Sequence, residues 1–294
     1  MSPPRLRLPF PGRTRTLAGP VAHAGPTRFL GMLLCYNDAD ILGPVIDHLA
    51  ANRHDVVVWN HGSEDETETV ARARLGRGVV EYQDIDRGEV PFRDLYGVCG
   101  RYLAEVYGGC YDWLSWPDQD EILEGPDVTR PYHEQVTEAL AAGVDWVEFD
   151  NFVFWFTDED DRSVADPVAR VRRYSLSPAA SPRVRAWRFA RTNERRLGNS
   201  NPIDGRKAPS NWPLRHYPMR SIEQARRRAH HDRNREGFQF GDRNWHYERF
   251  REDEAALRVP AEKLHRFEGG ALSRDITWTF YERPARLSGA AAPQ

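Results

Sequence analysis

The feature that most constrains the fold is a regular alternation of short apolar runs and helical patterns along the first third of the chain. Arg28–Tyr36 and Asp55–Trp59 are almost continuously apolar, which is typical of strands buried on both faces of a parallel sheet. Apolar residues at helical spacing follow in Ile41–Ala51 and in Glu66–Leu75, and Val79–Tyr82 has the composition of a third strand. This order predicts an open α/β sheet, whose ligands bind at the carboxyl ends of the strands.

Polar residues follow each of these predicted strands. Asn37 and Asp38 come after the first strand, and Asn60, His61 and Gly62 come after the second. Helix capping explains Asp38 on its own. A whole row of polar groups along one edge of the sheet is better explained by a binding site, because parallel strands end at the same edge.

Composition excludes several classes of protein. The chain of 294 residues has a formal net charge of −3, so it has no overall positive field to attract nucleic acid. Its three cysteines lack the paired spacing of a zinc site. The odd number of cysteines favours a reducing cytoplasm over a compartment in which disulfides form. We expect no membrane span, because no apolar run reaches about 18 residues, and the N-terminus lacks a signal-peptide core.

The most informative stretch lies near the middle of the chain. An aromatic and apolar run that ends in Trp116 predicts a buried strand, and Asp118, Asp120 and Glu121 follow it. Asp118 and Asp120 point the same way in an extended chain, and paired carboxylates suit Mg²⁺ or Mn²⁺. A single Asp-X-Asp is common in polar loops, but the aromatic strand before it and the third acid after it favour a functional site.

Three further acids are candidates for a catalytic base. Val144–Phe156 is the strongest predicted strand, and within it Glu148 and Asp150 face one side together, as the wall of a cleft would require. Asp204 lies in a polar loop that also contains Lys207, one of two lysines in the chain. Ordinary surface or turn positions are the alternative for each acid.

Arginine-rich segments fill much of the second half of the chain. The alternation in Pro167–Tyr174 and Val184–Ala190 predicts strands with one exposed basic face. Ser221–Gly237 is predicted to be a helix rich in arginine and histidine, either solvated or facing an anionic ligand. No glycine-rich phosphate loop is present, so a bound nucleotide would need arginine and a metal ion to neutralise its phosphates.

These patterns also predict the limits of the folded domain. We expect residues 1–27, rich in proline and arginine, to form a disordered arm. Residues 28–255 are predicted to form one α/β domain, and residues 256–294 a C-terminal extension with a disordered end.

Three segments together resemble the family 2 glycosyltransferases of the GT-A fold. They are Asn60-His61-Gly62-Ser63-Glu64-Asp65-Glu66-Thr67, then Asp118-Gln119-Asp120-Glu121, then His216-Tyr217-Pro218-Met219-Arg220-Ser221. The resemblance extends from about Arg28 to Ser221, and the ordered combination is more specific than any one segment. Asn60 and His61 stand where the family commonly has acids, and Glu66 stands where it has glycine.

The resemblance implies a GT-A (Rossmann-like) sheet and transfer of a sugar from a UDP- or GDP-sugar to the hydroxyl or amine of a small molecule or glycan, with inversion at the anomeric carbon. It implies Mn²⁺ or Mg²⁺ held by Asp118 and Asp120, with His216 either as a third ligand or as a donor to the diphosphate. The general base is not identified, and Glu148, Asp150 and Asp204 are its candidates. The residues expected to bind the donor are Asn37, Asn60, Gly62, Asp65, Arg93 and Lys207.

Two other classes remain open from the sequence. One is a phosphohydrolase in which Asp118 is the nucleophile and Asp120 the acid and base. The other is a non-catalytic module that binds nucleotide sugars, which the replacement of acids by Asn60 and His61 supports.

Overall fold

The computed structural model describes residues 15–20, 23, 25–85, 92–177, 182–189, 205–232 and 259–276. Asp204, and the segments predicted to be disordered at residues 1–14 and 287–294, lie outside these residues. The side chain of Arg93, in the first turn of a helix, is also outside them.

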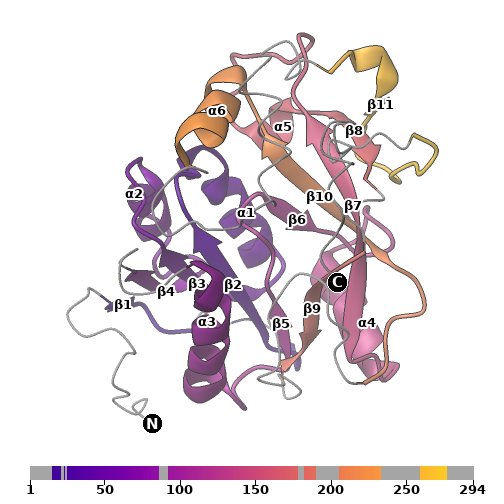
Figure 1. The fold of residues 1–294 in the computed structure, drawn as a ribbon. Helices are drawn as coiled ribbons and strands as arrows, with labels where there is room; N and C mark the ends of the chain where they lie inside the picture. The colour runs from indigo at the N-terminus through magenta and orange to yellow at the C-terminus, as the bar shows by residue number, and fades with distance from the viewer. Residues whose placement is uncertain are drawn as a thin grey trace, which may run out of the picture.

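The described part of the chain forms one large sheet with helices on both faces (Figure 1). Its strand order is β1-β4-β3-β2-β5-β9-β7-β10-β6, and β8 and β11 extend it beside β7. The strands are β1 Arg15–Leu17, β2 Phe29–Cys35, β3 His54–Asn60, β4 Val79–Asp84, β5 Trp113–Ser115, β6 Glu121–Leu123, β7 Trp146–Trp155, β8 Arg173–Leu176, β9 Arg183–Arg188, β10 Trp212–Met219 and β11 His265–Arg266.

The sheet has a parallel half and a mixed half. Strands β4, β3, β2 and β5 are parallel neighbours, as the alternation of strands and helices predicts. Beyond them β9 lies antiparallel between β5 and β7, whereas β10 is parallel to β7. The prediction of an open α/β sheet is therefore confirmed, and its parallel part is formed by the strands of the first half of the chain.

Helices cover the two faces of this sheet. They are α1 Ala39–Ala51, α2 Thr67–Arg72, α3 Phe92–Tyr107, α4 Tyr132–Ala141, α5 Pro167–Arg170 and α6 Ile222–Arg227, which continues into a π-helical turn at Arg228–Asp232. Leu103 of α3 packs with Trp59 and Leu114 on one face. Val45 of α1 packs with Leu33 on the opposite face, because side chains alternate along β2.

Two predictions about local structure are wrong. Residues 15–17, placed in the disordered arm, form β1, which pairs with β4 through the register Thr16↔Tyr82. Pro167–Tyr174 is not one strand, because Asp166 caps a short helix at Pro167–Arg170 by accepting from the Val168 N–H at 2.8 Å, and β8 starts only at Arg173.

Within the described residues, no helix is long and apolar enough to cross a membrane.

Candidate functional site

The turns after β2 and β3 are fastened to each other at the edge of the sheet. Asn37 has a φ of 53°, its N–H donates to Ser63 Oγ at 2.9 Å, and its Oδ1 accepts from the Glu64 N–H at 2.7 Å. Gly62 has a φ of 64°, a conformation that glycine adopts without strain. Asp65 accepts from the Ala39 N–H at 3.2 Å at the start of α1. These predicted donor-binding residues therefore lie together, and several of their polar atoms hold the turns in place.

Asn60 has its hydrogen-bonding capacity filled within the protein. Its Nδ2 donates to Asp84 Oδ1 and to Tyr82 Oη, each at 3.0 Å. Its Oδ1 accepts from Ser63 through the backbone N–H at 3.1 Å and the hydroxyl at 2.5 Å. An amide with two donors and one oxygen has no further hydrogen to offer a ligand. Asn60 therefore organises the turn, and the neighbouring carboxylate of Asp84 is the more available group.

Two of the three acids after β5 are paired with arginines of β9. Arg185 donates to Glu121 at 2.6 and 2.8 Å and to Asp118 Oδ2 at 2.5 Å. Arg183 donates to Glu121 Oε1 at 2.6 Å, and Tyr96 Oη lies 3.2 Å from Asp118 Oδ1. The predicted exposed basic face of this strand is therefore wrong, because Arg185 is only 3% exposed and faces acids.

Asp120 is the most buried member of the Asp-X-Asp motif, at 1% exposure. Its Oδ2 accepts from Arg228 at 2.7 Å, and its Oδ1 lies 3.5 Å from His216 Nε2. Strand pairing explains this contact, because β6 and β10 are antiparallel with Glu121 opposite His216. Two of the three predicted metal ligands are thus brought into contact by the sheet.

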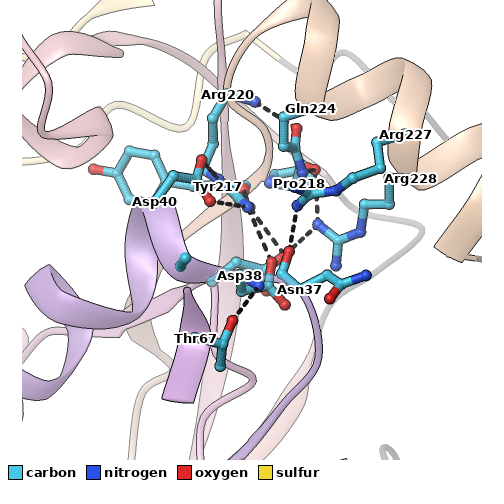
Figure 2. A network of polar contacts seen from close by, with 12 residues as sticks. Asn37, Asp38, Asp40, Thr67, Tyr217, Pro218, Arg220, Gln224, Arg227 and Arg228 are labelled. Atoms are coloured by element: carbon cyan, nitrogen blue, oxygen red, sulfur yellow. Dashed lines mark hydrogen bonds and ion pairs between the residues drawn. The ribbon is translucent and has the colours of Figure 1, made fainter. Parts of the chain in front are cut away.

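Arg220 joins the carboxyl end of β10 to the start of α1 (Figure 2). Its guanidinium donates to both oxygens of Asp40 at 2.7 and 2.8 Å and to Asp38 Oδ1 at 2.9 Å, and it lies 3.9 Å from Asp120 Oδ2. Ser221, the next residue, caps α6 by accepting from the Gln224 N–H at 3.1 Å. The segment His216–Ser221 therefore connects β10, α6, α1 and the Asp-X-Asp motif.

The protonation of these acids follows from burial and from the arginines. Burial alone would raise the pKa of Asp120, but Arg228 and His216 hold it well below its usual range. Burial is also outweighed at Glu121, where Arg185 and Arg183 lower the pKa to about 2. At Asp118, burial prevails and raises the pKa. Asp120 and Glu121 are consequently ionised at neutral pH.

The chemistry of Asp118, Asp120 and His216 suits a divalent ion, because carboxylate oxygen and imidazole nitrogen are both metal ligands. Their arrangement is not that of an assembled site: among the described residues, no group of three His, Cys, Asp or Glu side chains is placed to hold a metal. At both carboxylates an arginine is the contacting cation: Arg185 contacts Asp118, and Arg228 contacts Asp120.

Two of the three acids predicted as catalytic bases, Glu148 and Asp150, lie on β7 and each has a basic partner, whereas Asp204 lies outside the described residues. Glu148 forms an ion pair with Lys207, so the structure groups Lys207 with Glu148 rather than with the other predicted donor residues. Asp150 accepts from Asn211 at 2.9 Å and from Arg274 at 2.8 Å. Both acids project from the strand next to β9, which carries the arginines of the Asp118 cluster.

The sequence interpretation missed the arginines that complete this site, namely Arg183, Arg185 and Arg228. The pattern of β9 shows arginines in an otherwise apolar strand, but it does not tell whether they face water or buried acids, and Arg228 lies in a helical turn. The acids at 118–121 are the partners of these arginines, but nothing in the sequence of either segment shows that the two sets of residues are in contact.

Comparisons with known proteins give weak similarities. No protein-family model and no curated protein matches the chain. Among solved structures, glucosyl-3-phosphoglycerate synthase from Mycobacterium tuberculosis, in complex with phosphoglyceric acid, is 22% identical over 45% of this chain and 45% of its own, with a TM-score of 0.27. S. aureus TarS, residues 1–349 in complex with UDP, is 14% identical over 81% of this chain and 77% of its own, with a TM-score of 0.34. At these TM-scores, neither similarity defines the fold or the function of this chain.

Proposed function

We propose that this protein is a glycosyltransferase that moves a sugar from a nucleoside diphosphate to an acceptor hydroxyl or amine. One observation carries the proposal: the three segments that resemble family 2 glycosyltransferases, although distant in the sequence, converge on one edge of the sheet. Asn37 bonds the turn at Ser63 at 2.9 Å, Arg220 bonds Asp38 at 2.9 Å, and His216 lies 3.5 Å from Asp120. Unrelated matches to short motifs would have no reason to meet there.

The charges at this edge suit a diphosphate leaving group. Arg227 ends α6 and Arg228 begins the π-helical turn that follows it, and Arg220 lies between them and α1 (Figure 2). Guanidinium groups bind phosphate oxygens through charge-assisted hydrogen bonds. The arginines would therefore orient the donor and stabilise the negative charge that develops on the diphosphate as the glycosidic bond breaks.

Asp120 and His216, with Asp118, are the residues that would hold Mn²⁺ or Mg²⁺. When bound, such an ion acts as a Lewis acid that stabilises the leaving diphosphate. Hard carboxylate oxygens and one imidazole form a donor set that Mn²⁺ accepts more readily than Mg²⁺ does.

Transfer with inversion requires a base to accept the proton of the acceptor hydroxyl. Asp150 and Glu148 remain the candidates within the described residues, and Asp204 the candidate outside them. Asn211 and Arg274 fix Asp150 in one orientation, which a positioned base needs. This assignment makes the face of β7 that carries Glu148 and Asp150 the acceptor side.

The phosphohydrolase alternative is less well supported by the same geometry. It requires Asp120 to donate and accept a proton, whereas Arg228 and His216 keep the pKa of this buried carboxyl well below its usual range. A group that stays ionised at neutral pH is a poor general acid.

The test is a thermal-shift experiment with UDP, GDP and the other nucleoside diphosphates, each with and without Mn²⁺. A ligand of the folded state raises the melting temperature. We expect one nucleotide to stabilise the wild-type protein and Asp118→Ala with Asp120→Ala to abolish the shift. Asp161→Ala is the matched control, because Asp161 is an exposed loop acid that bonds Ser163. If no nucleotide shifts the wild-type protein under either condition, the proposed function is wrong.

A further inference from the structure

The candidate site is internally neutralised. Five acids at the edge of the sheet contact four arginines. The pairs are Asp38 and Asp40 with Arg220, Asp118 with Arg185, Asp120 with Arg228, and Glu121 with Arg183 and Arg185. Buried charges are tolerated when they are paired in this way. The positive and negative charges of this cluster are therefore nearly balanced before any ligand arrives.

This balance makes either ligand unfavourable alone. A diphosphate that took the arginines would leave ionised carboxylates unpaired, and a divalent ion at Asp120 would face the guanidinium 2.7 Å from the carboxylate oxygen. Both problems disappear when the two arrive together, because the diphosphate then pairs with the displaced arginine and the ion pairs with the carboxylates. Coulomb interactions in a site with little water make this difference large.

Arg228 is the arginine best placed to exchange. Arg220 is fixed by bonds to both oxygens of Asp40 and by another to Asp38, which lie on and before α1. Arg228 donates to Asp120 Oδ2 at 2.7 Å and to the Pro218 carbonyl at 2.8 Å, and it is the first residue of a π-helical turn. Such turns in a helix often occur at functional sites. Arg228 and His216 contact the same carboxylate, that of Asp120. Asp120 and His216 are two of the three residues that would hold a metal ion.

We propose that Arg228 is a displaceable internal counter-ion that occupies Asp120 in the donor-free protein and transfers to the donor diphosphate when a divalent ion binds Asp120. This inference rests on the proposed function, and it states how Arg228 controls ion binding at the donor site. It follows that the protein alone binds the ion poorly, and that removal of Arg228 exposes an ion site that works without nucleotide.

The experiment titrates the protein with Mn²⁺ and measures the free ion by its paramagnetic resonance signal, without nucleotide and then with UDP or GDP. We expect wild-type protein to bind Mn²⁺ at least about tenfold more weakly without nucleotide than with it. Arg228→Gln should bind Mn²⁺ alone at least about tenfold more tightly than the wild type does. Arg226→Gln removes the same charge from the neighbouring exposed position of α6 and should behave like the wild type.

Two results would overturn the inference: equal Mn²⁺ affinity of the wild type with and without the nucleotide that it binds, or equal Mn²⁺ affinity of Arg228→Gln and Arg226→Gln in the absence of nucleotide. If Arg228→Gln does not fold, Arg228→Lys tests the same question. The shorter lysine side chain keeps the charge but weakens the contact with Asp120. A Mn²⁺ affinity equal to that of the wild type would then overturn the exchange. Failure of the proposed function is distinguishable, since it is the absence of nucleotide binding to the wild type in any condition, whereas the arms with Mn²⁺ alone contain no nucleotide.

Discussion

Two buried carboxylates in this protein, Glu81 in the body of the sheet and Asp120 at its edge, are stabilised in different ways. Glu81 is fully buried and accepts from Tyr102 and Tyr107, each at 2.6 Å, and from Arg15 at 2.9 Å. Asp120 is almost as buried, but Arg228 and His216 are its partners. Two of the three donors to Glu81 are neutral phenols, which carry no charge to give to a ligand, whereas the partners of Asp120 are guanidinium groups and an imidazole. The first arrangement holds α3 and β1 onto the sheet, and the second leaves charge available for binding.

The largest effect that separates the two regions is expected from Glu81→Gln. The substitution breaks a buried ion pair and disturbs two tyrosine hydrogen bonds, so we expect the free energy of unfolding to fall by about 3 kcal/mol. Chemical denaturation measures this loss. Nucleotide-dependent thermal shifts should be retained, because Glu81 lies in the body of β4 rather than at the candidate site. Tyr107→Phe removes one of the hydrogen bonds and should cost about 1 kcal/mol. A lost nucleotide shift in folded Glu81→Gln would contradict the division between the two regions.

The second effect concerns pH and also originates in the body of the sheet. His54 is buried between the Asn52 carbonyl, 2.8 Å from Nδ1, and Ser115 Oγ, 2.9 Å from Nε2, and burial lowers its pKa to about 3. An unfolded histidine titrates near 6.5, so between these values the unfolded chain binds more protons and stability falls as the pH falls. Burial also lowers the pKa of His48 and of His133, so these two residues contribute to the pH dependence with the same sign.

Between pH 6.5 and pH 5, His54 alone should account for a loss of about 1.6 kcal/mol in the free energy of unfolding, because the slope increases toward about 1.4 kcal/mol per pH unit as the pH falls below 6.5. Urea denaturation at several pH values measures the slope, and His54→Gln should reduce it. An unchanged slope in this variant would show that the acid sensitivity arises elsewhere, for example at the edge of the sheet.

The smallest effect tests what a carboxylate at the edge needs. Asn60→Asp places a second acid next to Asp84, whose ion pair with Arg72 is long, at 3.7 Å from Oδ2, and it removes the donor that bonds Asp84 and Tyr82. We expect a loss of about 1 kcal/mol at pH 7, which becomes smaller near pH 5 as the acid pair takes up a proton. Asn60→Ser, which adds no charge, is the control, and equal pH dependence of the two variants would be evidence against the repulsion.

Sequence patterns predicted the parallel half of the fold well, because each strand and helix there has its own local signal. The periodicity located α1 and the strands on either side of it, and it predicted that Asn37, Asn60 and Asp118 would lie near strand ends. It could not assign roles at that edge. Asn60, expected to contact the donor, uses its amide to hold a turn, and its local pattern does not reveal this role.

The arginine partners could not be found for a different physical reason. Arg185 contacts Asp118 and Glu121 across sequence separations of 67 and 64 residues, and only the strand order β5-β9-β7 brings them together. An arginine in a strand has the same local pattern whether it faces water or a buried acid. The fold of the chain, rather than the segment, decides between the two.

The bonds from Arg220 to Asp40 join residues 180 positions apart. A contact of that separation forms late in folding, because the chain between the two residues loses entropy before the contact is made. β10 therefore has to be synthesised and inserted beside β7 before the start of α1 acquires its counter-ion. During translation, the nascent chain up to β9 would carry Asp38 and Asp120 without Arg220 or Arg228, so the parallel half can assemble early while the binding edge matures only after the last central strand has left the ribosome.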